Sequence, residues 1–316
     1  MRRLLRRLLG PSAPDATAGR RPRRDSAVYA LELRDGRAVA GTLRRLSPEG
    51  DFTQPMVSPC GTRVACWGTG AADHSLRIWV SSLDHEPAPV RLTGQEGMQG
   101  HPYWHPDGVR LVHFASRATS WDASRQFSPD RAPSQLWWLD TCTGAASQLT
   151  DGSYTDERPA VTPDGSGVVF VSNRSGRLNL WRVKEDGSGL TQLTEGTGPD
   201  YRPCISPDGQ WLAYFSAASD GSHQVRVRSL ADGRELDCSW TGRFHWSHGP
   251  FWCPDGRSLL VHARERGATS PALWIVDLES GSAERLDTPG VAGASHGTVD
   301  AAARWLVFDC RQAPGP

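Results

Sequence analysis

A short phrase that ends in Pro-Asp-Gly, or in a close variant of it, recurs along the 316 residues and constrains the fold more than any other feature. Five copies, QPMVSPCG, HPYWHPDG, RPAVTPDG, RPCISPDG and GPFWCPDG, begin at Gln54, His101, Arg158, Arg202 and Gly249. A sixth and degraded copy, HGTVDAAA, begins at His296. The second proline of each copy, or the alanine that replaces it in the last, recurs after 47, 57, 44, 47 and 47 residues. Such periods suit the four-stranded blades of a β-propeller.

The segments between the phrases predict the remaining strands of each blade. An apolar run, a polar turn, a strand that carries Trp and a short final strand follow the phrase. The sixth phrase is followed by only one strand, while Ala27–Leu33 and Ala38–Leu46 match the third and fourth strands of the other repeats. We therefore expect an all-β, six-bladed β-propeller over residues 27–310. Its last blade is formed by residues 296–310 together with 27–47, which removes an open sheet edge.

Segments outside this repeat are expected to be accessory. Residues 1–26 form a basic leader that we expect to be disordered, and residues 311–316 form a tail. The longest spacing comes from an insertion at Ala118–Pro133, a candidate lid on the second blade.

Composition excludes several classes of protein. The 35 basic and 35 acidic residues cancel, so we expect no nucleic-acid partner, although eight of the arginines lie within residues 1–24. Neither an export signal nor an apolar run of transmembrane length is visible. Seven cysteines without a C-x-x-C pair indicate reduced thiols. We expect a cytoplasmic monomer without a transmembrane segment, or a periplasmic one if the true start codon lies elsewhere.

The motifs resemble those of a known family. The Ser-Pro-Asp-Gly phrases, the turn Ser172–Gly176 (SNRSG), the Leu-Trp strand and the Gln-Leu-Thr ending are similar to those of TolB-type six-bladed propellers, also called WD-like propeller repeats. The resemblance covers about residues 27–310. It departs at Cys60, which replaces the aspartate of the turn, and at residues 301–303, where the turn motif is lost. It implies a fold rather than a particular function.

The residues that open the phrases are the candidate site. First strands surround the channel of a propeller, so these residues should form a ring at one mouth of it. Three histidines and a glutamine suit a divalent transition metal: His101, His248, His296 and Gln54. Arg158 and Arg202 suit a carboxylate or a phosphate. A purely structural role for these polar groups is the third interpretation.

A second resemblance concerns the metal. The stretches Trp246–Trp252 (WSHGPFW) and Ser295–Gly297 (SHG) are similar in character to His-bearing stretches of oligogalacturonate lyases, which are built on the same fold. The resemblance implies a manganese site made by the histidines and Gln54. It also implies that Arg158 or Arg202 is the base that removes the proton beside a uronate carboxylate.

Two functions of different classes follow. The leading hypothesis is a binding module without chemistry of its own, whose channel mouth takes an acidic small molecule, an oligosaccharide or a partner's peptide. Its expected ligand-binding residues are Gln54, His101, Trp104, Arg158, Arg202 and Trp252. The alternative is a metal-dependent lyase that acts on uronate-containing oligosaccharides, with no cofactor other than a divalent metal such as manganese.

One catalytic motif is rejected on its context. Gly293–Gly297 (GASHG) fits the G-x-S-x-G pattern of serine hydrolases, but that pattern requires a strand before the serine and a helix after it. Here a glycine-rich loop leads into a predicted strand. The repeated aspartates of the Pro-Asp-Gly turns are predicted to cap local backbone.

Overall fold

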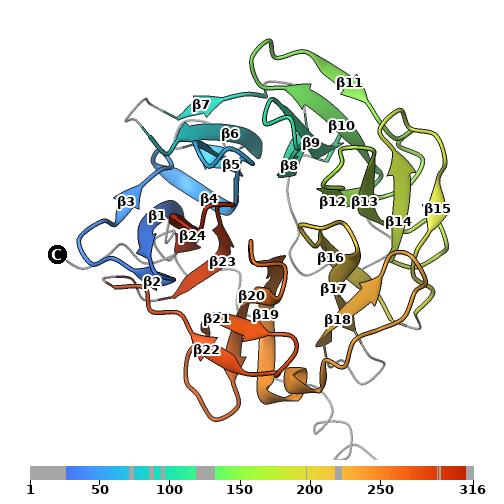
Figure 1. Cartoon of the computed structure of the whole chain (residues 1–316). Helices are drawn as coiled ribbons and strands as arrows, with labels where there is room; N and C mark the ends of the chain where they lie inside the picture. Colours follow the sequence, from blue (N-terminus) through green and yellow to red (C-terminus); the bar gives the residue numbers. More distant parts are fainter. Residues whose placement is uncertain are drawn as a thin grey trace, which may run out of the picture.

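Six β-sheets are arranged in a ring around a central axis in the computed structural model (Figure 1). The structure describes residues 26–70, 75–84, 89–93, 97–118, 132–196, 198–217, 223–289, 291 and 293–310. The basic leader before Ser26, most of the predicted lid and the tail 311–316 lie outside the described residues. The all-β, six-bladed prediction is confirmed.

Each of the first five blades is an antiparallel sheet whose strands follow one another along the chain. Blade 1 contains β4 (Gly50–Val57), β5 (Arg63–Gly70), β6 (Arg77–Ser82) and β7 (Val90–Arg91). Blade 2 contains β8 (Met98–Trp104), β9 (Arg110–Ser116), β10 (Ser134–Asp140) and β11 (Ala146–Gln148). Blade 3 contains β12 (Asp156–Val161), β13 (Gly167–Ser172), β14 (Asn179–Lys184) and β15 (Thr191–Gln192). Blade 4 contains β16 (Asp200–Ile205), β17 (Trp211–Ala217) and β18 (His223–Ser229). Blade 5 contains β19 (Phe244–Trp252), β20 (Ser258–Glu265), β21 (Ala272–Asp277) and β22 (Ala283–Arg285).

Blade 6 joins the two ends of the propeller. Its strands are β23 (Ala294–Val299), β24 (Trp305–Cys310), β1 (Ala27–Arg34), β2 (Arg37–Ala38) and β3 (Arg44–Arg45). β1 runs antiparallel to β24 over six residue pairs, from Ala27 opposite Cys310 to Glu32 opposite Trp305. Closure of the last blade by N-terminal strands is therefore confirmed, and the predicted fourth strand consists of the two short strands β2 and β3.

Blade 4 differs from the expected four strands. After β18 the chain makes a turn closed by the Ser229 amide, which donates to the Arg234 carbonyl oxygen at 2.8 Å. Arg228 and Glu235 then form a single bridge, and the chain leaves for the 3₁₀ helix η2 (Ser239–Arg243). The fourth strand of this blade is thereby reduced to one residue pair.

The turn aspartates cap local backbone, as predicted. The Asp107 Oδ1 atom accepts from the amides of Val109 (2.8 Å) and Arg110 (3.0 Å), and Asp255 does the same for the two residues that precede and begin β20. In the degraded sixth copy, Asp300 accepts from the amides of Arg304 (2.6 Å) and Trp305 (2.7 Å). The turn that had lost its motif therefore keeps a carboxylate cap one position before the expected proline.

Neighbouring blades pack through apolar side chains of the inner three strands. Second strands bury a phenylalanine in four blades: Phe114, Phe170, Phe215 and Phe308 are at most 1% exposed. Indole groups add hydrogen bonds between blades, since Trp104 Nε1 donates to the Met56 carbonyl oxygen and Trp252 Nε1 to that of Cys204, both at 3.0 Å. Among the described residues, no helix is long and apolar enough to span a membrane.

Candidate functional site

Every first strand carries a bulge at the residue that opens the repeated phrase. In each blade, two residues of the first strand lie opposite a single residue of the second. In five blades the second bulge residue is proline, which has no N–H for the ladder and is tolerated where pairing is interrupted. The first bulge residue has a positive φ in every blade: Gln54 (51°), His101 (51°), Arg158 (52°), Arg202 (57°), Gly249 (99°) and His296 (47°).

Five of these six positions carry a side chain despite this left-handed backbone, which costs a non-glycine residue about 1–2 kcal/mol. Gln54, His101, Arg158, Arg202 and Gly249 line one pocket at the channel mouth. The predicted ring is thus brought together, with His296 beside it. The space between the lining atoms, including the part that is open to solvent, is about 490 Å³.

A hydrogen-bonded chain fixes the blade 6 and blade 1 side of the mouth. The Trp67 indole donates to Gln54 Oε1 at 3.0 Å, which turns the amide nitrogen of Gln54 toward His296 Nε2, 3.5 Å away. His296 Nδ1 lies 2.8 Å from Asp309 Oδ2. Burial lowers the pKa of His296, so the ring is neutral at pH 7 and its Nδ1–H donates to Asp309.

Asp309 on β24 is the centre of this chain. Its carboxylate is buried and accepts hydrogen bonds from the hydroxyls of Thr53 and Ser295, from the backbone N–H of Gln54 at 3.1 Å and from His296. These donors lower the pKa of Asp309 against the opposing effect of its burial, so it is ionised at pH 7. The carboxylate therefore ties the last blade to the first and sets the orientation of His296.

Two arginines form the opposite side, from blades 3 and 4. Arg158 is 5% exposed and its Nε lies 3.5 Å from Oε1 of the buried Glu157. Arg202 keeps part of its surface open to the pocket. Burial, followed by repulsion from Arg158, lowers the pKa of Arg202 to about 9 even though Glu157 and Asp309 raise it. A bound anion beside the two guanidinium groups would favour the charged form of Arg202.

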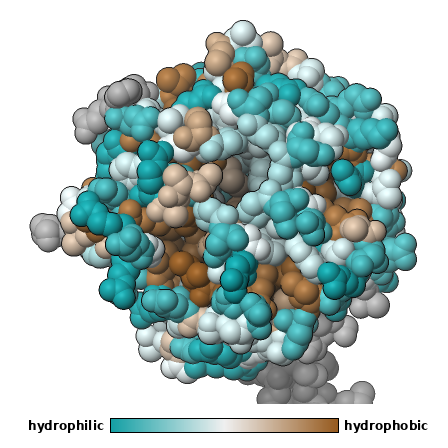
Figure 2. Space-filling view, viewed as in Figure 1, coloured by the Kyte–Doolittle hydropathy of each residue, from teal (hydrophilic) through white to brown (hydrophobic). Residues whose placement is uncertain are grey.

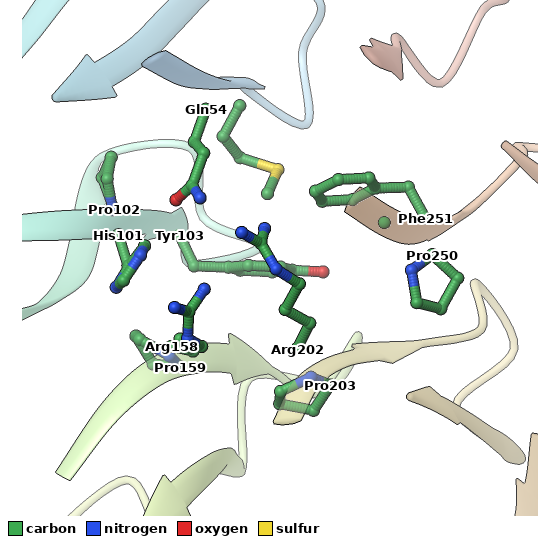
Figure 3. Close-up of a pocket in the computed structure, with 12 residues that line it drawn as sticks. Gln54, His101, Pro102, Tyr103, Arg158, Pro159, Arg202, Pro203, Pro250 and Phe251 are labelled. Carbon is green, nitrogen blue, oxygen red and sulfur yellow. The ribbon is translucent and has the colours of Figure 1, made fainter. Parts of the chain in front are cut away.

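Apolar groups complete the pocket. Figure 3 shows Pro250 and Phe251 on the side opposite Gln54 and His101, with the Tyr103 ring extending across the pocket toward that side. Gly249 itself contributes no side chain to this side of the pocket. Figure 2 shows a hollow near the centre of the disc, with hydrophilic and apolar surface around it.

Other predicted site residues are placed elsewhere. Trp104 and Trp252 are at most 9% exposed, do not line the pocket, and donate to the backbone of the preceding blade, which is a packing role. His101 lies in the pocket wall, with its ring 4.8 Å from that of Trp67 and 5.2 Å from that of Phe114. The side chain of His248 lies outside what the structure describes, although its backbone pairs with that of His262.

The described residues do not assemble a metal site. No group of three or more His, Cys, Asp or Glu side chains among them is placed to hold an ion. Gln54 directs its nitrogen, not its oxygen, toward His296. Because the His248 side chain is not described, the set of His101, His248, His296 and Gln54 stays a prediction.

The serine and the histidine of the G-x-S-x-G segment both contact Asp309 of β24, but not in a catalytic order. The Ser295 hydroxyl donates to Asp309 rather than to His296, and the outer nitrogen of His296 faces Gln54. A serine nucleophile requires its hydroxyl on the histidine. This arrangement is consistent with the rejection of the motif on sequence grounds.

Sequence reasoning missed Asp309, Met56, Tyr103 and Phe251. Met56, Tyr103 and Phe251 lie two residues after the ring position in their blades, so the alignment of phrases that identified the ring also contained them, two columns further on. Asp309 had a weaker signal: it is a charged residue in a second strand where other blades place an apolar or aromatic side chain.

These features define a class of protein: a closed six-bladed propeller with a cationic pocket at its channel mouth. The family model described as "TolB beta propeller domain" matches residues 126–295, more than half of the chain. The chain belongs to this TolB β-propeller family.

Similar proteins extend the comparison. A protein of Agrobacterium fabrum, named uncharacterized protein Atu1656, is 30% identical over 91 residues, which is 28% of this chain and 27% of that protein. The structure of TolB from Acinetobacter baumannii is 17% identical with a TM-score of 0.63, over 91% of this chain and 64% of the other. This chain thus spans less than two thirds of either protein. An oligogalacturonate lyase in complex with manganese is 15% identical with a TM-score of 0.61, over 91% of each chain. These structural likenesses show the fold.

Proposed function

We propose that this propeller is a binding module whose channel mouth takes the anionic group of an acidic ligand. The observation that carries the proposal is the pair Arg158 and Arg202, held together at the pocket by the bulges of adjacent blades. Two like charges placed together in a poorly hydrated site repel each other, and a bound carboxylate or phosphate removes that repulsion. Guanidinium groups also bind such anions in bidentate geometry.

Isothermal titration calorimetry with acetate, hexanoate, galacturonate and phosphate tests this function. We expect at least one of these anions to bind one-to-one. Arg202→Met should weaken it by about 10- to 100-fold, which corresponds to the loss of one charge-assisted hydrogen bond. Arg257→Met is the matched control, because Arg257 is exposed and pairs with Glu279 away from the mouth. Absence of binding, or equal binding by both variants, would refute the proposal.

A lyase that acts on uronate-containing oligosaccharides is a second candidate, favoured by the lowered pKa of Arg202. A general base works best when its pKa is near the working pH, and a pKa of about 9 brings Arg202 much closer to that range than an ordinary arginine. In this function Arg202 would accept the proton beside the carboxylate, and Arg158 would hold the carboxylate itself.

Incubation with oligogalacturonate, with and without added manganese, tests the lyase. Unsaturated uronides absorb in the ultraviolet, so turnover gives a rise in absorbance that Arg202→Met should abolish. No rise under either condition counts against the lyase and leaves the binding module unaffected.

A further inference from the structure

The pocket has two chemically different sides. Arg158 and Arg202 come from blades 3 and 4, whereas Pro250 and Phe251 come from blade 5, directly after Gly249 (Figure 3). Most of the exposed lining is apolar rather than polar. A ligand that places its anionic group on the arginines therefore has carbon surface beside it.

The apolar groups are held in place by the protein core. Tyr103 and Phe251 are partly buried and pack against the large cluster formed between blades 3, 4 and 5. Met56 packs against the cluster between blades 1 and 2. A preformed apolar surface loses little conformational entropy when a ligand covers it, and covering it is favourable in proportion to the area removed from water.

Sugars are a poor match for this surface. Each ring carbon of a uronate carries a hydroxyl or a carboxyl group, and a hydroxyl that loses water without gaining a hydrogen bond opposes binding. Prolines, Tyr103, Met56 and Phe251 present carbon to most of the pocket. An aliphatic or aromatic tail meets the same surface without that penalty.

We propose that the ligand is an amphiphilic carboxylate, with its carboxylate on Arg158 and Arg202 and a short apolar tail over Met56, Tyr103, Pro250 and Phe251. This inference rests on the proposed function and adds the ligand's chemical class to it. The apolar lining takes the tail, and the two arginines give the ligand its orientation.

Calorimetric titration of the full chain with acetate, butyrate, hexanoate and galacturonate provides the test. Burial of a methylene group corresponds to about a fourfold gain in affinity, so hexanoate should bind at least tenfold more tightly than acetate. Galacturonate should bind no more tightly than acetate. Equal affinities along the series, or a preference for galacturonate, would overturn the amphiphilic ligand while leaving an anion site in place. No binding of any of the four carboxylates would also overturn the amphiphilic carboxylate, and if phosphate fails to bind as well, the proposed function itself is refuted.

Two variants locate the parts of the ligand. Met56→Gln keeps nearly the same shape but replaces the thioether with an amide, and it should weaken hexanoate about tenfold more than acetate. Arg202→Met should weaken both ligands equally. A Met56→Gln variant with unchanged hexanoate affinity would contradict the placement of the tail, and the wild-type series alone still decides the ligand class.

Discussion

Asp309→Asn removes the charge at the point where the last blade meets the first. The buried carboxylate accepts from Thr53, Gln54, Ser295 and His296, all of which are donors. An amide has only one acceptor oxygen, and its NH₂ group then faces a donor. Breaking a buried, hydrogen-bonded charge in this way costs about 3–5 kcal/mol. We therefore expect a free energy of unfolding lower by about that amount, and a melting temperature lower by roughly 10 °C.

Urea unfolding followed by tryptophan fluorescence and by circular dichroism measures this change at pH 7. Asp287→Asn is the matched control, because Asp287 is exposed and should change the free energy of unfolding by less than about 0.5 kcal/mol. A loss below about 1 kcal/mol for Asp309→Asn would show that the carboxylate does not hold the two blades together.

The pH dependence of the same difference gives a second check. The pKa of Asp309 is lowered in the folded protein, chiefly by His296 once the opposing effect of burial is overcome. Its stabilising contribution is therefore present above the unfolded value of about 4 and is lost as the pH falls through the lower folded value. The difference between wild type and Asp309→Asn should be constant from pH 5 to 8 and should narrow only below about pH 4. A difference that disappears near pH 6 would assign the effect to a histidine instead.

Three further outcomes follow from the structure. Affinity for a bound carboxylate should fall as the pH rises above about 9, where Arg202 loses its proton, and calorimetry at pH 7 and pH 10 measures this. Gly68→Ala should destabilise the protein by more than about 3 kcal/mol, because a Cβ at this position would lie 2.3 Å from a carbonyl oxygen of β4. Thermal melting measures the change, with Gly242→Ala as the control because a Cβ there meets no atom within 4 Å. Trp252→Phe should lower the free energy of unfolding by about 1–3 kcal/mol, because it leaves the buried Cys204 carbonyl without the indole donor; an unchanged urea midpoint would contradict this.

The repeat made most of the fold predictable. Every copy of the phrase after the first contains a turn with its own capping carboxylate, and every copy begins within a first strand, so six copies specify six blades by local chemistry. The same alignment placed Gln54, His101, Arg158 and Arg202 in one column, and a column of a closed repeat is a ring in space.

What escaped prediction depends on contacts between repeats. Asp309 of blade 6 accepts hydrogen bonds from Thr53 and Gln54 of blade 1, and these residues belong to another copy of the repeat. Blade 4 loses its fourth strand because a turn after Ser229 leads the chain away to η2, which is a property of loop geometry. Asp300 caps the turn of the sixth copy in place of the lost aspartate. It stands one residue before the position of the proline, so aligning the phrases did not reveal its role.

The bulge at the start of each phrase separates the identity of a side chain from its position. Strand pairing and the following proline set the backbone of the bulge. That backbone directs the side chain toward the channel mouth, whether the residue is glutamine, histidine or arginine. Because two bulge residues lie opposite a single residue of the second strand, a ring residue can be replaced without changing the register of the strands. What is lost is local, such as the contacts of Gln54 and His101 with Trp67. The channel mouth therefore has six equivalent backbone positions that can carry different side chains. A propeller of this design can acquire a new ligand by exchanging a few of these residues, without having to evolve a new fold.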